Sequence, residues 1–174
     1  AMSIPLVLGY FPIAFSFGVA ATRAGLSAAE AIMFSVVIFA GAAQFLAIAL
    51  VASGAPLPIA ALTLIVMNLR HVMYGPTVME KAGKDASTRH AWAWGWTLTD
   101  EVFATTLGAL ARGGRFSEGL IGGIGIGAYL SWIAGTILGA LTGGGALAAY
   151  PVVNAGLGFM LPALFLSLLL SILN

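Results

Sequence analysis

The sequence predicts an all-α polytopic membrane protein, and three observations indicate this fold class. Charged residues make up 7% of the 174 residues, whereas soluble domains carry about 25%. Apolar residues make up 60%, and the mean hydropathy is +1.04. The apolar residues also gather into runs long enough to cross a bilayer. A water-facing surface cannot be built from so few charges, so most of the chain must face lipid or other helices.

Composition and motifs exclude several function classes. The net charge is +1 and the chain has no cysteine, so we expect no nucleic-acid partner, no disulfide framework and no cysteine metal site. No Walker motif is present, and "GIGIGA" (123–128) lacks the preceding strand that a dinucleotide-binding loop requires. An intramembrane hydrolase would need a nucleophile and a base, but Ser35, Ser131 and His71 have no recognisable spacing. We therefore expect a protein without enzymatic activity, cofactor or metal.

Spans that could cross the membrane follow from the length of the apolar runs. About 20 apolar residues cross the hydrocarbon core as a helix. Six runs reach this length: 4–22, 28–52, 57–79, 92–111, 119–142 and 155–173.

The boundaries of the first three spans have local causes. Pro12, within "GYFPIAFSFG" (9–18), removes a helical hydrogen bond and predicts a break in the first span. The start of the second span is marked by "SAAE" (27–30), a capping box in which Ser27 caps the helix and Glu30 reaches back. The third span follows a proline-containing turn.

The fourth span, 92–111, is predicted to be broken or re-entrant. Thr97 to Asp100 fits the capping pattern, here inside the membrane, and Gly95 interrupts the preceding tryptophans. A broken helix presents its dipole end and free backbone groups to a substrate. The alternative is a tryptophan belt at the interface, followed by an ordinary helix.

The fifth span carries a row of small residues at every fourth position, which predicts close packing against another helix of this chain or of a second protein. The row consists of Gly119, Gly123, Gly127, Ser131, Gly135, Gly139 and Gly143.

We predict a single membrane domain, 1–174, with halves 1–88 and 89–174. A shift of 88 residues lays the first three spans on the last three and sets Glu30 on Glu118. Three spans per half would make the halves inverted, as in many secondary transporters. The chance similarity of Ala/Gly/Leu-rich segments is the open alternative.

The predicted crossings distribute basic residues unequally. The side with more of them faces the cytoplasm under the positive-inside rule, which places the loop 80–90 there. That side would carry Arg23, Lys81, Lys84 and Arg89, and the other side Arg112 and Arg115.

Arg70, His71, Asp100 and Glu101 are ionisable residues inside predicted spans. A charge at mid-membrane costs roughly a few kcal/mol, so such residues face the bundle interior or a wet cavity and pair with one another. We predict that Arg70 pairs with Asp100 or Glu101. The two acids are adjacent and point about 100° apart, so they cannot both face one cavity equally. A structural ion pair, or an arginine that reaches the interface, is the open alternative.

Neutral polar residues also lie inside the spans. Gln44 and Asn68 could bind a ligand or bond a neighbouring helix. His71 lies three residues from Asn68 on the same helical face and can titrate near neutral pH, so a proton relay with Glu101 is one interpretation. A satisfied interior histidine is the other.

Five segments together resemble the AzlC family of bacterial branched-chain amino-acid permeases. They are "GYFPIAFSFG" (9–18), "AGLSAAEAIMFS" (24–35), "FAGAAQF" (39–45), "NLRHVMYGP" (68–76) and "LTDEVFA" (98–104). The resemblance implies a multi-pass protein of the bacterial cytoplasmic (inner) membrane. It also implies export of valine, leucine and their analogues, and a small hydrophobic AzlD-type partner.

We therefore expect a secondary transporter subunit whose site lies between the halves. The open alternative is a non-transporting assembly subunit, and a homo-oligomer is also left open. The expected substrate-binding residues are Pro12, Gln44, Asn68, Arg70, Thr99 and Asp100. The expected residues for proton or ion coupling are His71, Asp100 and Glu101.

Overall fold

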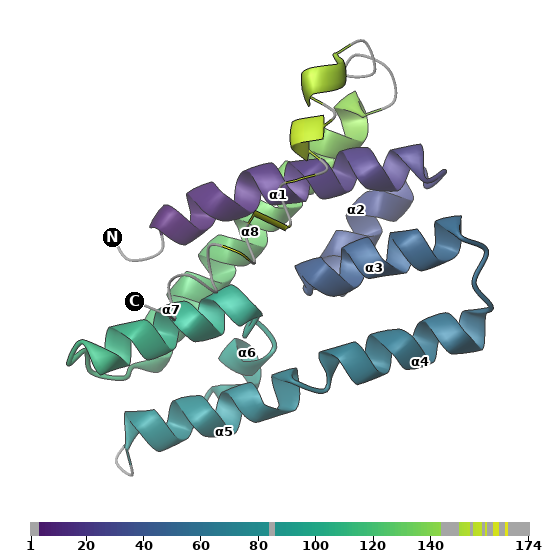
Figure 1. The fold of residues 1–174 in the computed structure, drawn as a ribbon. Helices are drawn as coiled ribbons and strands as arrows, with labels where there is room; N and C mark the ends of the chain where they lie inside the picture. The colour runs from purple at the N-terminus through teal and green to yellow at the C-terminus, as the bar shows by residue number, and fades with distance from the viewer. Residues whose placement is uncertain are drawn as a thin grey trace.

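The computed structural model describes residues 4–83, 86–143, 150–153, 155–157, 159, 162–163 and 166 (Figure 1). Regular structure within these residues is entirely helical, which confirms the predicted all-α membrane fold. The helices are α1 (Ile4–Arg23), α2 (Ala28–Val37), α3 (Gly41–Ala52), α4 (Leu57–Asn68), α5 (His71–Ala82), α6 (Ala91–Gly95), α7 (Asp100–Ala111) and α8 (Glu118–Thr142).

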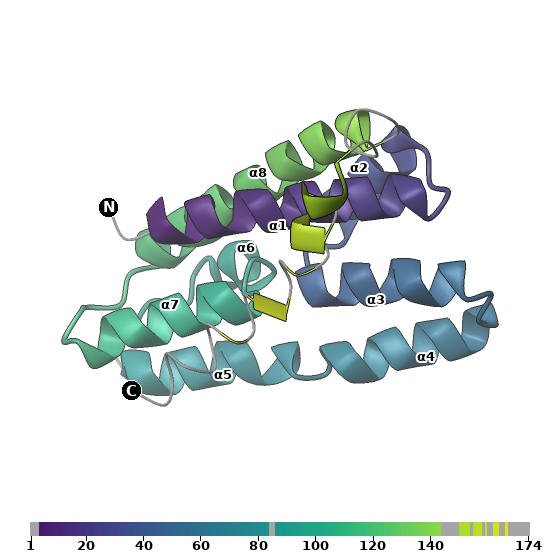
Figure 2. The same cartoon turned by 45° about the horizontal axis from the view of Figure 1, so that its top comes forward.

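Three described segments are long and apolar enough to cross a membrane. They are Leu6–Arg23 in α1, Leu57–Ala82 through α4 and α5, and Glu118–Thr142 in α8. The predicted spans 28–52 and 92–111 instead form hairpins of two short helices each (Figures 1 and 2). The predicted sixth span, 155–173, lies largely outside the described residues.

The first hairpin, α2–α3, was not predicted. Its helices separate at residues 38–40, where Ile38 and Ala40 adopt non-helical backbone angles. Val36, Val37 and Ile38 are consecutive β-branched residues, which lowers helix propensity there. The predicted capping box is confirmed at its start, and the hydrogen bond from Ser27 lowers the pKa of Glu30. The start of α2 and the end of α3 lie at the same end of the molecule as the end of α1 (Figure 1).

The second hairpin, α6–α7, confirms the predicted break in the fourth span. Its two ends lie at the same end of the molecule: the backbone N–H of His90, before α6, donates to Glu118 Oε1 at 2.7 Å, and α8 begins at Glu118. The chain enters with α6, turns at 96–99 and returns with α7. In both views the two hairpins approach from opposite ends (Figures 1 and 2).

This topology corrects the predicted distribution of basic residues. Lys81 and Arg115 line the same surface hollow, so they lie at one end rather than on opposite sides. Arg23, at the end of α1, lies at the other end (Figure 1). The prediction failed because it counted the hairpins as crossings. The first miscount moves the loops 53–56 and 80–90 to the wrong side, and the second miscount returns the loop 112–117 to its original side. The cytoplasmic placement of the loop 80–90 stays a prediction.

The closest helix pair is α1 with α8, and part of the small-residue row makes it possible. A Cβ atom at Gly135 would meet the Phe11 carbonyl and Ala14, and one at Gly139 would meet the backbone of Phe15. Ser131 and Gly143 are also buried. The start of the row behaves differently, because Gly119 and Gly123 are exposed and Gly127 is half-buried.

The first and third spans also differ from the prediction: the first is a continuous helix, and the third is divided into two helices. Helix α1 runs unbroken past Pro12, so the predicted break there is wrong. A proline within a helix removes one backbone bond, and the packing of α1 on α8 holds the remaining turns together. The third span divides at Leu69 and Arg70. Hydrogen bonds there join residues three apart, such as Val72 N–H to the Leu69 carbonyl at 3.1 Å, and tighten the turn.

The predicted halves, 1–88 and 89–174, stay a prediction. The shift of 88 residues sets the unbroken α1 against the divided α6–α7, and the divided α2–α3 against the unbroken α8. The described helices therefore do not support a one-to-one match of spans.

Candidate functional site

The turns of the two hairpins meet at an aromatic cluster in the middle of the molecule. Phe39, from the α2–α3 turn, lies 6.3 Å from Trp96 of the α6–α7 turn, measured between ring centroids. Tyr129 of α8 contacts both rings, at 5.2 and 5.0 Å. Tyr10 of α1 adds edge contacts to Phe39 at 6.1 Å and to Trp132 at 5.3 Å. The cluster therefore brings both interrupted spans against α1 and α8.

Helix α7 begins beside this cluster, with polar groups buried around its first turn. Thr99 caps the helix by accepting a hydrogen bond from the Val102 N–H, so the cap lies two residues after the predicted Thr97. The Tyr10 hydroxyl donates to the Glu101 carboxylate and contacts the Thr99 hydroxyl. Glu101 is 9% exposed. Sequence reasoning identified Thr99 and Glu101 but missed Tyr10, which lies in an apolar run 91 residues from Glu101.

The predicted ion pair is present between the third and fourth spans. Arg70 Nη2 lies 2.7 Å from Asp100 Oδ2, with the side chains 38% and 19% exposed. Tyr74 donates a hydrogen bond to the other oxygen of Asp100 and stacks on Phe103, with ring centroids 4.3 Å apart. Asp100 and Glu101 thus contact different partners, as their angular separation predicts.

The α4–α5 turn contains buried polar atoms that have no hydrogen-bond partner among the described residues. They include the Asn68 Oδ1 acceptor and the Arg70 Nε donor. The Asn68 Nδ2 group donates to the Leu64 carbonyl at 2.8 Å, which fixes the side chain. Buried polar atoms are usually paired, so this turn presents an acceptor and a donor, two residues apart, whose hydrogen-bonding capacity is unused among the described residues.

His71 belongs to this turn and leads toward Asp100. Its Nδ1 lies 3.1 Å from the Asn68 carbonyl, and its ring contacts Tyr74 at 5.1 Å between centroids. Tyr74 in turn donates to Asp100. The contacts therefore connect His71 with Asp100 through Tyr74, whereas the sequence-based relay paired His71 with Glu101.

Gln44 is held by hydrogen bonds within the described chain, and Pro12 lies inside a helix; their roles in substrate binding stay predictions. The Gln44 amide donates to the Ile38 carbonyl at 2.6 Å, and its oxygen accepts from Trp132 Nε1 at 2.8 Å. Gln44 is completely buried. It therefore stabilises the α2–α3 turn by satisfying a carbonyl that the interrupted helix leaves free. Pro12 lies half-buried within the continuous α1.

Metal-binding groups were not expected, and the described residues contain no group of three or more His, Cys, Asp or Glu side chains that could hold a metal ion.

The fold and its buried polar centre define this chain as a polytopic α-helical membrane protein in which two hairpins meet from opposite ends. Residues 5–146 match the family model described as AzlC protein, and the chain belongs to this family.

Relatives support the same class. The chain is 46% identical over 170 residues to the inner membrane protein YgaZ of Escherichia coli (strain K12), covering 97% of this chain and 69% of that protein. It is 41% identical over 168 residues to a membrane protein of Archaeoglobus fulgidus, covering 97% and 71%. It is 29% identical over 166 residues to the branched-chain amino acid transport protein AzlC of Bacillus subtilis (strain 168), covering 94% and 62%. No solved structure matches the chain. The family and these relatives support a role in membrane transport.

Proposed function

We propose that this chain is the transporting subunit of a secondary exporter for branched-chain amino acids in the bacterial inner membrane. The name of the Bacillus subtilis relative, branched-chain amino acid transport protein AzlC, supports the substrate class. A small hydrophobic AzlD-type subunit is the proposed partner. The chain contains no Walker motif, so the proposed energy source is an ion gradient.

The α4–α5 turn carries the proposal. An amino acid presents a carboxylate that accepts hydrogen bonds and an ammonium group that donates them. Arg70 Nε is a buried donor, and Asn68 Oδ1 is a buried acceptor, each without a partner among the described residues. The substrate carboxylate would bind Arg70, and its ammonium would bind Asn68 and Asp100. Such charge-assisted bonds are short and about twice as strong as neutral ones.

The aromatic cluster offers the apolar part of the proposed site. Phe39 and Trp96 belong to the two hairpin turns, and a branched aliphatic side chain would gain free energy by leaving water against such rings. Because Gln44 is held by Ile38 and Trp132, its proposed contribution is to position the turn that carries Phe39.

Glu101 is the proposed coupling residue. It is buried in the first turn of α7 and receives a hydrogen bond from Tyr10, while the adjacent Asp100 pairs with Arg70. One carboxylate would therefore carry a proton while the other holds the substrate ammonium. His71, connected to Asp100 through Tyr74, is the proposed route between this centre and water.

The test measures valine efflux from proteoliposomes that contain the purified chain with its proposed partner. Glu101→Gln keeps the side-chain shape but cannot release a proton, so efflux driven by a pH gradient should fall at least tenfold while valine binding persists. Glu80→Gln, on the exposed end of α5, is the matched control. Wild-type efflux in Glu101→Gln would remove Glu101 from the mechanism.

A non-transporting assembly subunit is the second candidate. Two observations favour it. Gly119 and Gly123, two of the seven residues in the packing row, are exposed, and only 6% of the most apolar window of the Leu57–Ala82 span is buried within the described chain. Both surfaces could receive another subunit, including a second copy of this chain. Valine flux that the partner alone catalyses in liposomes would favour this candidate, and flux that requires Arg70 of this chain would exclude it.

A further inference from the structure

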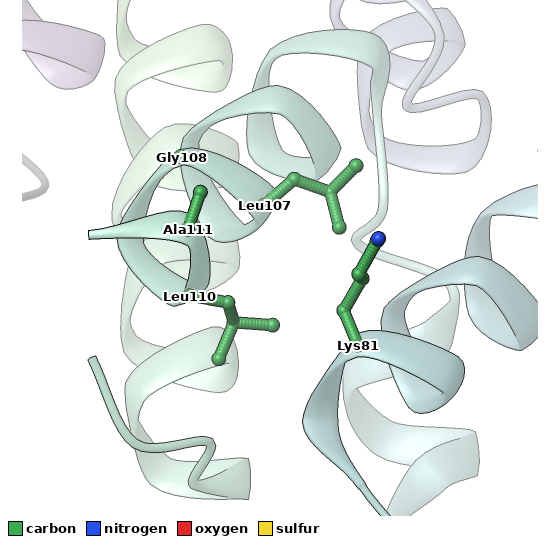
Figure 3. A pocket seen from close by; sticks show the side chains of 5 residues that line it. All are labelled: Lys81, Leu107, Gly108, Leu110 and Ala111. Atoms are coloured by element: carbon green, nitrogen blue, oxygen red, sulfur yellow. The ribbon is translucent and has the colours of Figure 1, made fainter. Parts of the chain in front are cut away.

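A groove lies between the ends of α5 and α7, well away from the aromatic cluster. Its first part is a hollow of about 400 Å³ lined by Lys81, Leu107, Gly108, Leu110 and Ala111 (Figure 3). The Lys81 side chain reaches from α5 toward Leu107 on α7, so its ammonium group overlies apolar side chains.

The groove continues into a second hollow of about 340 Å³, which shares Lys81 and Leu110 with the first and also includes Arg115. Arg112 approaches the apolar part as well, because a Cβ atom at Gly108 would lie 3.3 Å from Arg112 Nη1. The described residues that line the two hollows include two cations and no acid. The first hollow is therefore lined mainly by apolar residues, and Lys81, Arg112 and Arg115 supply positive charge along the groove.

The position of the groove decides which ligand suits it. Helices α5 and α7 end at Ala82 and Ala111 and are followed by polar loops, so the groove lies where a membrane-spanning segment meets the headgroup region. A phospholipid at that depth has its phosphate beside the loops and its acyl chain against the helices. Basic pockets between membrane helices bind the headgroups of anionic lipids.

We propose that this groove binds an anionic phospholipid. The phosphate lies between Lys81 and Arg115, and the first part of an acyl chain fills the hollow beside Leu107, Gly108 and Ala111. The lipid would bridge α5 and α7. Arg70 directly precedes α5, and Asp100 is the first residue of α7. This inference stands whether or not the chain carries amino acids, because no residue of the central site takes part.

The test counts lipids bound to the purified full chain by native mass spectrometry. The protein is titrated with phosphatidylglycerol, with zwitterionic phosphatidylcholine and with inorganic phosphate. Each basic residue near an anionic headgroup contributes about a fivefold gain in affinity. Lys81→Gln should therefore weaken phosphatidylglycerol binding about fivefold, and added salt should weaken binding to the wild type further.

Two variants separate a specific groove from general charge attraction. Ala111→Leu adds bulk to the lining of the apolar hollow without changing charge and should also weaken phosphatidylglycerol binding. Arg89→Gln removes a positive charge at the same end, outside the groove lining, and should bind as the wild type does. Circular dichroism and gel filtration check folding, and if Ala111→Leu does not fold, the comparison of Lys81→Gln with Arg89→Gln still decides.

Equal binding of phosphatidylglycerol by the wild type and Lys81→Gln would overturn the proposal. So would equal binding of the zwitterionic lipid, or displacement of phosphatidylglycerol by millimolar inorganic phosphate, which would indicate a site for a free anion.

Discussion

Arg70 and Asp100 form the contact on which the proposed site depends. Their 2.7 Å ion pair joins the third span to the second hairpin, and both groups remain partly exposed. A purely structural pair and a substrate-binding pair would have the same geometry. They differ in what happens when both charges are removed together.

We predict that the neutral double variant Arg70→Gln/Asp100→Asn folds but loses valine transport. Removing one partner leaves an unpaired, partly buried charge and should destabilise the fold, whereas removing both avoids that cost. Thermal unfolding in detergent and efflux from liposomes measure the two effects. Efflux at the wild-type rate in the double variant would mean that the pair serves only to hold the spans together.

Tyr10 and Glu101 should be energetically coupled, since the tyrosine hydroxyl donates to the buried carboxylate. We predict that Tyr10→Phe costs about 1–3 kcal/mol in the wild type and less when Glu101 is already glutamine. A double-mutant cycle on unfolding in denaturant should give a coupling of about 0.5–3 kcal/mol. Additive effects would show that the hydrogen bond contributes nothing measurable.

Sequence reasoning reached the charged residues of the site but not their aromatic partners. Four ionisable groups in apolar spans stand out because each would be costly alone, so their pairing could be predicted. Tyr10 and Tyr74 fit an apolar run equally well as packing residues. Their hydrogen bonds to Glu101 and Asp100 depend on contacts 91 and 26 residues apart in the chain, which no local pattern encodes.

Among the elements, the α2–α3 hairpin has a buried glutamine at its turn. Gln44 satisfies the Ile38 carbonyl and the Trp132 N–H at once. We predict that Gln44→Leu destabilises the fold by about 2 kcal/mol or more, because it leaves both groups buried and unpaired. Gln44→Glu retains an acceptor for Trp132 but loses the donor to Ile38, so it separates the two contacts. A melting temperature unchanged in Gln44→Leu would contradict this role.

The α1–α8 pair offers a matched test within one row of glycines. Gly139→Ala places a methyl group against the Phe15 backbone, and such overpacking typically costs about 1–3 kcal/mol. Gly119→Ala, in the same helix and the same row, meets no atom within 4 Å and should leave stability unchanged or slightly raised. The two variants are compared by their thermal unfolding. Equal destabilisation would show that backbone contact between α1 and α8 is not the reason for the glycine.

The break in span four could be predicted and the break in span two could not. Thr97 to Asp100 places a capping pattern inside an apolar run, which a helix interior does not need. Residues 36–41 offer a β-branched run and a glycine, but many continuous membrane helices contain both. The side chains of Gln44 and of Tyr129 in α8 donate to carbonyls at that turn, and Gln44 also accepts from Trp132 of α8, so the break follows from tertiary structure.

Over the whole molecule, a hairpin and a crossing have similar length and hydropathy, but they place the following loop on opposite sides of the membrane. A crossing carries the chain to the other side, whereas a hairpin returns it to the side from which it entered. Counting 92–111 as a crossing separated Lys81 from Arg115, which the structure brings into one groove. The site and the lipid groove both require that the hairpins return to the ends from which they enter.

Cysteine accessibility tests this topology most directly, because the chain contains no cysteine of its own. Single cysteines replace the exposed residues Ala29, Ser53, Ser87 and Arg112, and a membrane-impermeant maleimide is applied to intact cells and to inverted vesicles. We predict that positions 87 and 112 react from one side of the membrane, and positions 29 and 53 from the other. Reaction of 87 and 112 from opposite sides would make α6–α7 a crossing and would contradict the proposed site.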